Sequence, residues 1–532
     1  MEKYVEPIRI VTIRLCESAE VLLKGNPCQT GNAIAGEMTV IRKGGYVLLD
    51  FGKEIHGCVQ IAIQRIDGIQ PARLRIVYGE SVMEALSSIG EKNATNSHAP
   101  RDFIAEVMPM SSVPYGETGF RFVKLEAVDA DISILAVKAV LRIRDLDYLG
   151  SFECSDESLN EIWRMAAYTV QLNMHEFVWD GIKRDRLVWI GDMHPEASVI
   201  RYIFGEDESV TNSLDFIRIM TPENAWMNNI PTYSMWWIII QHDWYMHWGR
   251  MEYLKEQKTY MQMLVDKAAS WIDSGCDDTD FNLFVDWPSR NAEYEKDGVK
   301  SIFCMGLSCA AALFKAMDET EYERKCQQYA EKLRKEESKV KLSKCISALT
   351  LLSGRDAGAA VERVSDDSAE NMTCFMGYYL LLAKAKLGQL KGALEVIKSY
   401  WGAMIKMGAT TFWEDFDISW TENAARIDEI VPEGKRDIHG DFGRFCYKQF
   451  RHSLCHGWAG GPAPFLMEKV GGIEIVEAGC RTIRIAPDLA GLEWAKISFP
   501  TPYGVVKLDI RNENGKMQVQ VEAPSGITII QD

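Results

Sequence analysis

The sequence predicts a multidomain protein in which a central all-α (α/α)6 toroid is flanked by an N-terminal and a small C-terminal antiparallel β-sandwich. A chain of 532 residues exceeds one ordinary hydrophobic core, so two to four domains are expected. The apolar periodicity changes from strand-like to helical at Ser155 and becomes strand-like again near Gly471. We therefore expect domains at residues 1–150, 151–465 and 466–532.

The N-terminal domain is predicted from short apolar runs, several of which alternate with polar residues. These runs cover residues 46–52, 59–63, 74–78 and 120–125, and Gly, Pro or Asp residues separate them. Short strands with frequent turns are typical of an antiparallel sandwich. The polar stretch 87–101 is predicted to be a long loop.

Helical spacing begins after Ser155, which we expect to be an N-cap because Asp156 and Glu157 follow in the first turn. Apolar runs predict helices at 302–317 and 374–387, the second ended by a glycine. Helical hairpins over some 300 residues, with aromatic and acidic residues in their loops, favour a toroid. No clear short repeat supports a solenoid.

The charged stretch 320–341 predicts an amphipathic helix on the solvated outer face. Beyond it, the C-terminal domain is expected to contain strands at 475–476, 482–485, 505–508, 517–521 and 527–530. Residues 512–515 carry the signal of a hairpin turn.

Composition excludes several classes of protein. A net charge of −17 argues against a nucleic-acid binder, which needs a basic face. The thirteen scattered cysteines indicate buried thiols in a reducing compartment, and the absence of a Cys-x-x-Cys pair makes a zinc site unexpected.

Neither a signal-peptide pattern nor a run of about 18 apolar residues is present. We expect a cytoplasmic protein without membrane contact, metal or cofactor; a removed signal peptide and a homo-oligomer stay open.

The segment 179–192 carries the densest chemistry in the chain, with carboxylates, arginines and tryptophans within one short span. Aromatic faces stack on the C–H surface of a sugar ring, and carboxylates and guanidinium groups bond its hydroxyls. A carboxyl that is partly desolvated by such neighbours can have a raised pKa and act as a general acid. The alternative is an Asp/Arg ion-pair network that only holds a loop.

This segment resembles the signature of glycoside hydrolase family 78, the α-L-rhamnosidases, whose usual form is Asp-Cys-Pro-x-Arg-(Asp)-Glu-Arg-Leu-x-Trp-x-Gly-Asp. The matching residues are Asp180, Arg184, Arg186, Leu187, Trp189, Gly191 and Asp192. Gly181 and Ile182 replace Cys-Pro, and Asp185 stands where the family has its general acid, a Glu. The side chain of Asp185 is one methylene shorter than that Glu.

Two further motifs follow in the order found in the family. Residues 408–414 resemble Gly-Ala-Thr-Thr-x-Trp-Glu, whose Glu is the general base, here Glu414. Residues 453–458 resemble Ser-Leu-x-His, whose His lines the sugar site, here His456. The flanking stretches 115–123 and 499–504 resemble the β-sandwiches on either side of the family's catalytic toroid, so the likeness covers nearly the whole chain.

The resemblance implies an inverting route with Asp185 as general acid and Glu414 as general base, their carboxyls roughly 6.5–9.5 Å apart. The expected substrate-binding residues are Asp180, Arg184, Trp189, Asp192, Trp237, Trp287, Trp413 and His456. Structural alternatives remain for several of them. Asp192 could cap a helix, Asp415 competes with Glu414, and His456 and Trp237 could be core residues.

The predicted function is therefore removal of terminal α-L-rhamnose, or of a closely related sugar, from a carbohydrate substrate by an inverting exo-glycosidase. Two alternatives stay open: a sugar-binding relic, which the Asp at position 185 permits, and another toroid enzyme such as a lyase or an epimerase. A lyase should carry a Tyr/His/Arg base cluster, whereas this site is acidic.

Overall fold

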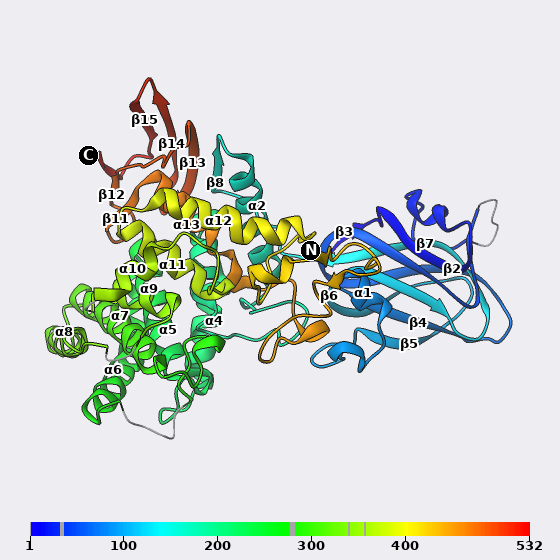
Figure 1. Ribbon diagram of the computed structural model, residues 1–532, viewed down its shortest axis with the longest axis horizontal. Coiled ribbons are helices and arrows are strands. Elements are labelled where there is room, and N and C mark those ends of the chain that lie inside the picture. Colours follow the sequence, from blue (N-terminus) through cyan, green and yellow to red (C-terminus); the bar gives the residue numbers. More distant parts are fainter. Residues whose placement is uncertain (1, 32–36, 277–281, 339–340, 356–357, 532) are drawn as a thin grey trace.

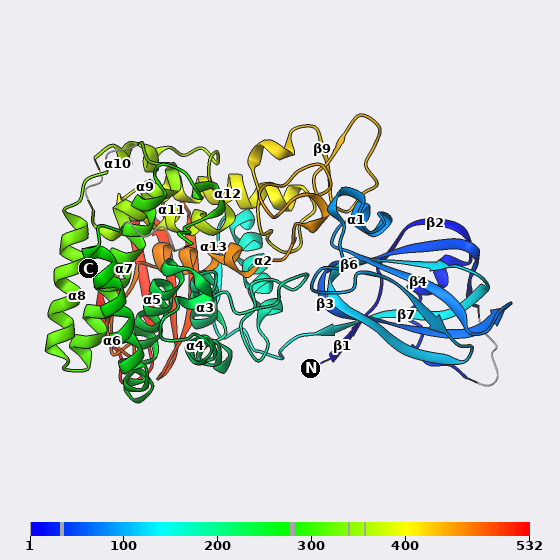
Figure 2. The same cartoon turned by 90° about the horizontal axis from the view of Figure 1, so that it is seen from below.

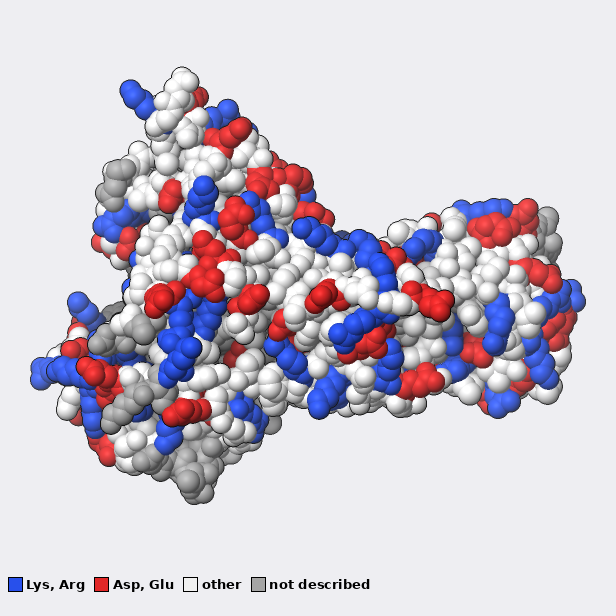
Figure 3. Space-filling model, in the orientation of Figure 1, with Lys and Arg blue, Asp and Glu red and all other residues white. Residues whose placement is uncertain are grey.

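The computed structural model describes residues 2–31, 37–276, 282–338, 341–355 and 358–531. A β-rich N-terminal body lies at one end of an elongated molecule, and a helical body lies at the other (Figure 1). Two small C-terminal sheets pack against the helical body. Basic and acidic side chains are interspersed over the face shown in Figure 3, so neither sign of charge dominates that face.

The N-terminal body is one seven-stranded antiparallel sheet of order β1-β7-β3-β6-β4-β5, with β2 paired to β3. Its strands are β1 (Glu2–Val5), β2 (Arg9–Glu17), β3 (Thr39–Asp67), β4 (Ala72–Gly79), β5 (Asp102–Val107), β6 (Ser111–Ala127) and β7 (Asp131–Arg142). The sheet surrounds one apolar core. The strands predicted at 46–52 and 59–63 are one strand, because β3 continues through Gly52 and Gly57, which tolerate positive φ.

The short helix α1 (Val82–Leu86) and the predicted loop 87–101 follow β4. The loop contains one short 3-10 turn, Glu91–Asn93. Figure 2 shows α1 at the end of the β body that faces the rest of the molecule. The backbone N–H of Val82 donates to the carbonyl of Ile427 at 2.8 Å, which ties this end to the helical body.

The helical body contains α2 (Glu157–Asn173), α3 (Met193–Ile203), α4 (Glu208–Met220), α5 (Pro231–Trp248), α6 (Met251–Asp273), α7 (Glu295–Ala316), α8 (Thr320–Arg334), α9 (Lys344–Ser353), α10 (Gly358–Ser365), α11 (Cys374–Lys386), α12 (Leu390–Lys406) and α13 (Pro462–Phe465). Tight turns join α5 to α6 and α11 to α12 at Gly249 and Gly388, whose positive φ favours glycine. Helix α8 buries only Cys326, Ala330 and Leu333 among its described side chains, as a helix on the outer face should.

Three helix predictions need correction. Helix α8 ends at Arg334, seven residues before the predicted end. The N-cap of α2 is Asp156, whose side chain accepts from the N–H of Ser158. Ser155 does not cap the helix because its hydroxyl accepts from the N–H of Glu493, in the C-terminal part, at 2.9 Å. Helix α7 begins seven residues earlier than expected, and among the described helices it alone has the length and apolar composition of a membrane span. Most of it is buried, and it packs against α5, α8 and α9.

The C-terminal part has a three-stranded sheet, β11 (Ile473–Glu477), β12 (Thr482–Ile485) and β16 (Thr528–Gln531), and a four-stranded one, β15 (Lys516–Glu522), β14 (Gly504–Glu513), β13 (Trp494–Thr501) and β8 (Ser151–Cys154). The hairpin at 512–515 is confirmed, since Glu513 pairs with Lys516. The expected all-antiparallel pattern is wrong, because β12 and β16 pair in parallel. Strand β8 belongs to this sheet although it precedes α2, because it pairs with β13.

Candidate active site

The three sequence motifs lie side by side, joined by backbone hydrogen bonds. The N–H of Gly457 donates to the carbonyl of Asp180 at 2.9 Å. The N–H of His456 donates to the carbonyl of Phe412 at 3.0 Å. A side chain at position 457 would collide with the buried carboxyl of Glu196, so this close approach requires glycine. Segments more than 200 residues apart in the sequence thus form one site.

The loop that follows Asp180 is closed by its own side chain, which accepts from the N–H of Leu187 at 3.0 Å. Asp185 and Arg186 both have left-handed backbones, with φ values of 60° and 53°. Such conformations store strain in non-glycine residues and concentrate at functional sites. Gly191 leaves room for the ring of Tyr233, which would lie 2.3 Å from a Cβ at that position.

Arg184 bridges the two carboxylates predicted to be catalytic. Its Nη2 lies 2.5 and 2.6 Å from the two oxygens of Glu414, and its Nη1 lies 3.1 Å from Oδ2 of Asp185. The Arg184 side chain is 6% exposed. Because one guanidinium holds both carboxyls, Asp185 and Glu414 face the same cavity.

Burial sets the protonation of the other acids in the site. It raises the pKa of Asp192 to about 8 and that of Asp180 well above its usual value. Burial also raises the pKa of Glu414, although the ion pair with Arg184 opposes the shift. Burial and the nearby Arg184 charge lower the pKa of His456, so its contacts of 3.6–4.0 Å with the three carboxyls are those of a neutral imidazole.

The cavity has a volume of about 260 Å³, which suits one sugar unit better than a long chain. Aromatic side chains form much of its wall, namely Trp189, Tyr233, Phe284, Trp287, Tyr447 and Trp458. Polar groups at the same wall include Asp180, Asp192 and His456. Apolar ring faces combined with a few convergent polar groups are the chemistry that binds a carbohydrate.

Two predicted tryptophans lie outside the described lining of this cavity. Trp237 is fully buried, and its Nε1–H donates to the carbonyl of Leu214 at 3.1 Å. The cavity reaches only the first turn of α5, where Tyr233 takes the expected place of Trp237. Trp413 is 1% exposed and packs edge-on against Phe416.

Two of the structural alternatives are resolved by hydrogen bonds. Asp192 lies at the start of α3, but it caps none of the described backbone N–H groups there and accepts from the hydroxyl of Tyr233 at 2.6 Å. Asp415 forms an ion pair with Arg444 at 2.8 Å. Glu414, not Asp415, therefore lines the cavity.

Trp287 lines the cavity as predicted, and Asp286 holds it there. The Asp286 carboxylate accepts from the N–H of Trp287 at 2.7 Å and from the hydroxyl of Thr373 at 2.6 Å. The sequence prediction missed Tyr233 and Tyr447. Nothing in their local sequence marks them, since each is one aromatic residue among many.

Glu80, Glu84 and His439 are grouped closely enough to hold a metal ion. The ammonium of Lys183 already lies 3.2 and 2.8 Å from the two carboxylates. Because this cation is already paired with both carboxylates, we describe the buried group as an ion-pair cluster beneath the active-site loop.

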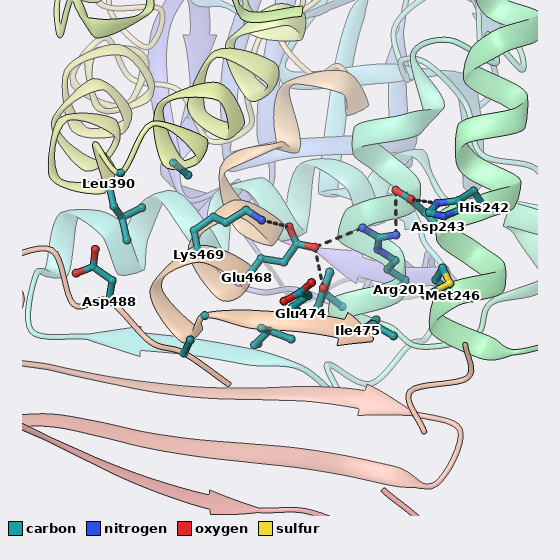
Figure 4. A pocket seen from close by; sticks show the side chains of 16 residues that line it. Arg201, His242, Asp243, Met246, Leu390, Glu468, Lys469, Glu474, Ile475 and Asp488 are labelled. Atoms are coloured by element: carbon teal, nitrogen blue, oxygen red, sulfur yellow. Dashed lines mark hydrogen bonds and ion pairs between the residues drawn. The ribbon is translucent and has the colours of Figure 1, made fainter. Parts of the chain in front are cut away.

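A larger cavity, of about 570 Å³, lies at the opposite ends of α3 and α5 (Figure 4). Several of its charged groups pair with one another: Arg201 lies 3.1 Å from Asp243 and 3.6 Å from Glu468, and His242 lies 3.0 Å from Asp243. Of the Phe, Trp and Tyr residues, only Tyr202 belongs to its described lining, and it is 1% exposed. The smaller cavity is therefore the candidate active site.

Comparison with known families shows which proteins this chain resembles. Residues 147–341 match the family model described as the bacterial alpha-L-rhamnosidase 6 hairpin glycosidase domain. Residues 472–530 match the model of the bacterial alpha-L-rhamnosidase C-terminal domain. An alpha-L-rhamnosidase of Formosa agariphila is 23% identical over 191 residues, which are 35% of this chain and 20% of that protein.

Solved structures share the fold. The GH78 family rhamnosidase of Bacillus sp. GL1 has a TM-score of 0.75 at 20% identity, and the match covers 94% of this chain and 55% of that one. A rhamnosidase from Klebsiella oxytoca with rhamnose bound has a TM-score of 0.70 at 19% identity. This match covers 88% of this chain and 95% of that one. The chain thus spans about a fifth of the curated relative and about half of the Bacillus protein.

Proposed function

Because this chain carries the six-hairpin glycosidase domain and the C-terminal domain of the bacterial α-L-rhamnosidases, we propose that it is a glycoside hydrolase that removes terminal α-L-rhamnose. The observation that carries the proposal is the aromatic-walled cavity in which Arg184 joins Asp185 and Glu414. A sugar-sized slot with two carboxyls is the minimum that glycosidic hydrolysis needs. The proposed substrate is a carbohydrate whose terminal sugar enters this slot.

In the proposed mechanism, Asp185 protonates the glycosidic oxygen while the C1–O bond breaks. Glu414 takes a proton from water as that water attacks C1 from the opposite face, which inverts the configuration. Arg184 holds both carboxyls in position. Asp180, Asp192 and His456 would bond the sugar hydroxyls, and Trp189 and Trp287 would pack on the ring.

The cavity wall combines apolar and polar side chains, which matches rhamnose, a 6-deoxy sugar with both a methyl group and hydroxyls. Its methyl group needs an apolar contact, which Ile230 and Phe284 can offer inside the cavity. We further propose that the helices from α2 to α13 form the (α/α)6 toroid of the six-hairpin glycosidases. The cavity at the N-terminal ends of α3 and α5 supports this arrangement.

The test is release of free L-rhamnose from a nitrophenyl α-L-rhamnoside and from a rhamnosyl disaccharide. Glu414→Gln should abolish turnover but keep sugar binding, because the amide cannot take the proton of water. Asp185→Asn should lose about 10²-fold or more on the disaccharide and far less on the nitrophenyl glycoside, whose leaving group scarcely needs protonation.

Other outcomes would change the assignment. Equal losses on both substrates in Asp185→Asn would mean that Asp185 binds sugar, and Asp180 would become the next candidate acid. A wild type that binds rhamnose but hydrolyses nothing, and that gains activity in Asp185→Glu, would be a sugar-binding relic. A product with a new double bond would indicate a lyase.

A further inference from the structure

The proposed acid has a partner from another part of the molecule. His98, in the loop that follows α1, lies with Nε2 3.1 Å from Oδ1 of Asp185. The guanidinium of Arg186 donates to the backbone carbonyl of His98 at 3.1 Å, which holds the loop against the active-site segment. His98 and Asp185 are 87 positions apart in the sequence, the first in the N-terminal body and the second in the helical body.

The two oxygens of Asp185 face different groups. Oδ2 faces Arg184, whose guanidinium is always charged in proteins and cannot supply a proton. Oδ1 faces His98, whose ring nitrogens can each carry or release a proton. The side chains of His98 and Asp185 are 37% and 19% exposed, so the imidazole lies nearer to solvent than the carboxyl does.

We propose that His98 supplies the proton to Asp185 between turnovers and holds its carboxyl in position; this inference rests on the proposed function. An acid that has protonated a leaving group is left as a carboxylate, which must regain a proton. The Nε2–H of protonated His98 passes its proton to Oδ1 of Asp185, and the neutral imidazole takes a new proton from solvent. Glu414 releases to solvent the proton that it took from water, so the cycle balances.

The contacts with Arg184 and His98 also position the short side chain at position 185. A carboxyl held from one side by Arg184 and from the other by His98 has a defined orientation. His98, from the β body, thus gives the shorter side chain of Asp185 a second contact besides Arg184. Among the described residues, the charged groups linked to His98 by these contacts are Asp185, Arg184 beyond it, and Arg186.

Two substitutions separate proton supply from mere support. His98→Gln can place an amide N–H beside Asp185 but cannot carry a proton, and His98→Ala can do neither. Both should lower kcat on the rhamnosyl disaccharide by about tenfold or more and leave the nitrophenyl rhamnoside nearly unchanged. Added imidazole should restore the rate of His98→Ala. A wild-type rate in His98→Ala, or full activity in His98→Gln, would overturn the proposal.

A second measurement does not depend on turnover. The chain has nine histidines, and the ring-nitrogen NMR signals of His98 can be assigned by their loss in His98→Gln. Asp185→Asn should shift these signals, whereas the exposed control Asp145→Asn should not. An unshifted signal would refute the contact even if the wild type released no rhamnose. Rhamnose release without any effect at position 98 would leave the proposed function standing and remove only this inference.

Discussion

At the scale of single residues, the site is governed by carboxyl groups that are buried with few cations to balance them. Arg184 is shared by Asp185 and Glu414, so Asp192 depends on the hydroxyl of Tyr233 instead. A hydrogen bond from a neutral donor offsets little of the desolvation of a charge. Asp192 is therefore held largely in its protonated form at neutral pH, with a pKa of about 8.

This burial predicts a pH-dependent stability. The pKa of Asp192 rises from 3.8 to about 8 on folding, so the folded state binds this proton more tightly than the unfolded state. Its stabilising effect is complete below pH 3.8 and is lost as pH rises towards about 8. Asp192→Asn keeps an acceptor for Tyr233 and has no such proton to lose.

Urea unfolding of both proteins from about pH 5 to about pH 8 checks this expectation. The free energy of unfolding should fall more steeply with pH in the wild type than in Asp192→Asn. Parallel pH profiles would show that the folded environment does not favour the neutral carboxyl. Asp145→Asn, at an exposed position, should follow the wild type.

At the scale of elements, the active-site loop is anchored by Lys183 to α1. The ammonium lies 2.8 Å from Glu84 and 3.2 Å from Glu80, and it donates to the carbonyls of Phe450 and His452 at 2.8 Å each. Lys183 is 7% exposed. The residue next to the bridging Arg184 is thus held by the β body.

Lys183→Met should destabilise the protein by about 3–5 kcal/mol, because it leaves buried carboxylates without their cation. The matched control is Lys3→Met, which breaks an exposed ion pair with Asp145 and should cost at most about 1 kcal/mol. Urea unfolding at one pH measures both. If the two variants differ little, the cluster under the loop contributes no more than a surface ion pair.

At the scale of the whole molecule, the β body and the helical body are joined through polar contacts that surround the site. Arg121 donates to the carbonyl of Gly408 at 3.1 Å, and the N–H of Glu54 donates to the hydroxyl of Thr410 at 2.9 Å. Both contacts end on the segment that leads to Glu414. Loss of either body would therefore disturb the proposed base as well as the loop of Asp185.

This coupling predicts that the two bodies unfold together. Calorimetry should show one main transition, and saturating rhamnose bound to Glu414→Gln should move the whole transition to higher temperature. A separate early transition that rhamnose leaves unchanged would mean that the β body folds independently of the site. The variant Lys183→Met offers a comparison, because it weakens the same junction.

The part of this description that follows from sequence alone is local. Helical spacing predicted α11 and its terminal Gly388, and the turn residues predicted the hairpin between β14 and β15. These features depend on the backbone preferences and periodicity of short segments. That Asp180, Asp185 and Glu414 belong to one site was implied by the resemblance of two distant segments to the motifs of one family, and the cavity contains all three residues.

Tertiary structure decided which side chains meet. Tyr233 lines the cavity and Trp237 does not, because the cavity reaches only one turn of α5. Strand β8 joins a sheet formed by residues more than 300 positions later. His98 meets Asp185 only because two bodies dock. Contacts of this kind depend on the packing of distant segments, about which the local pattern of each segment carries no information.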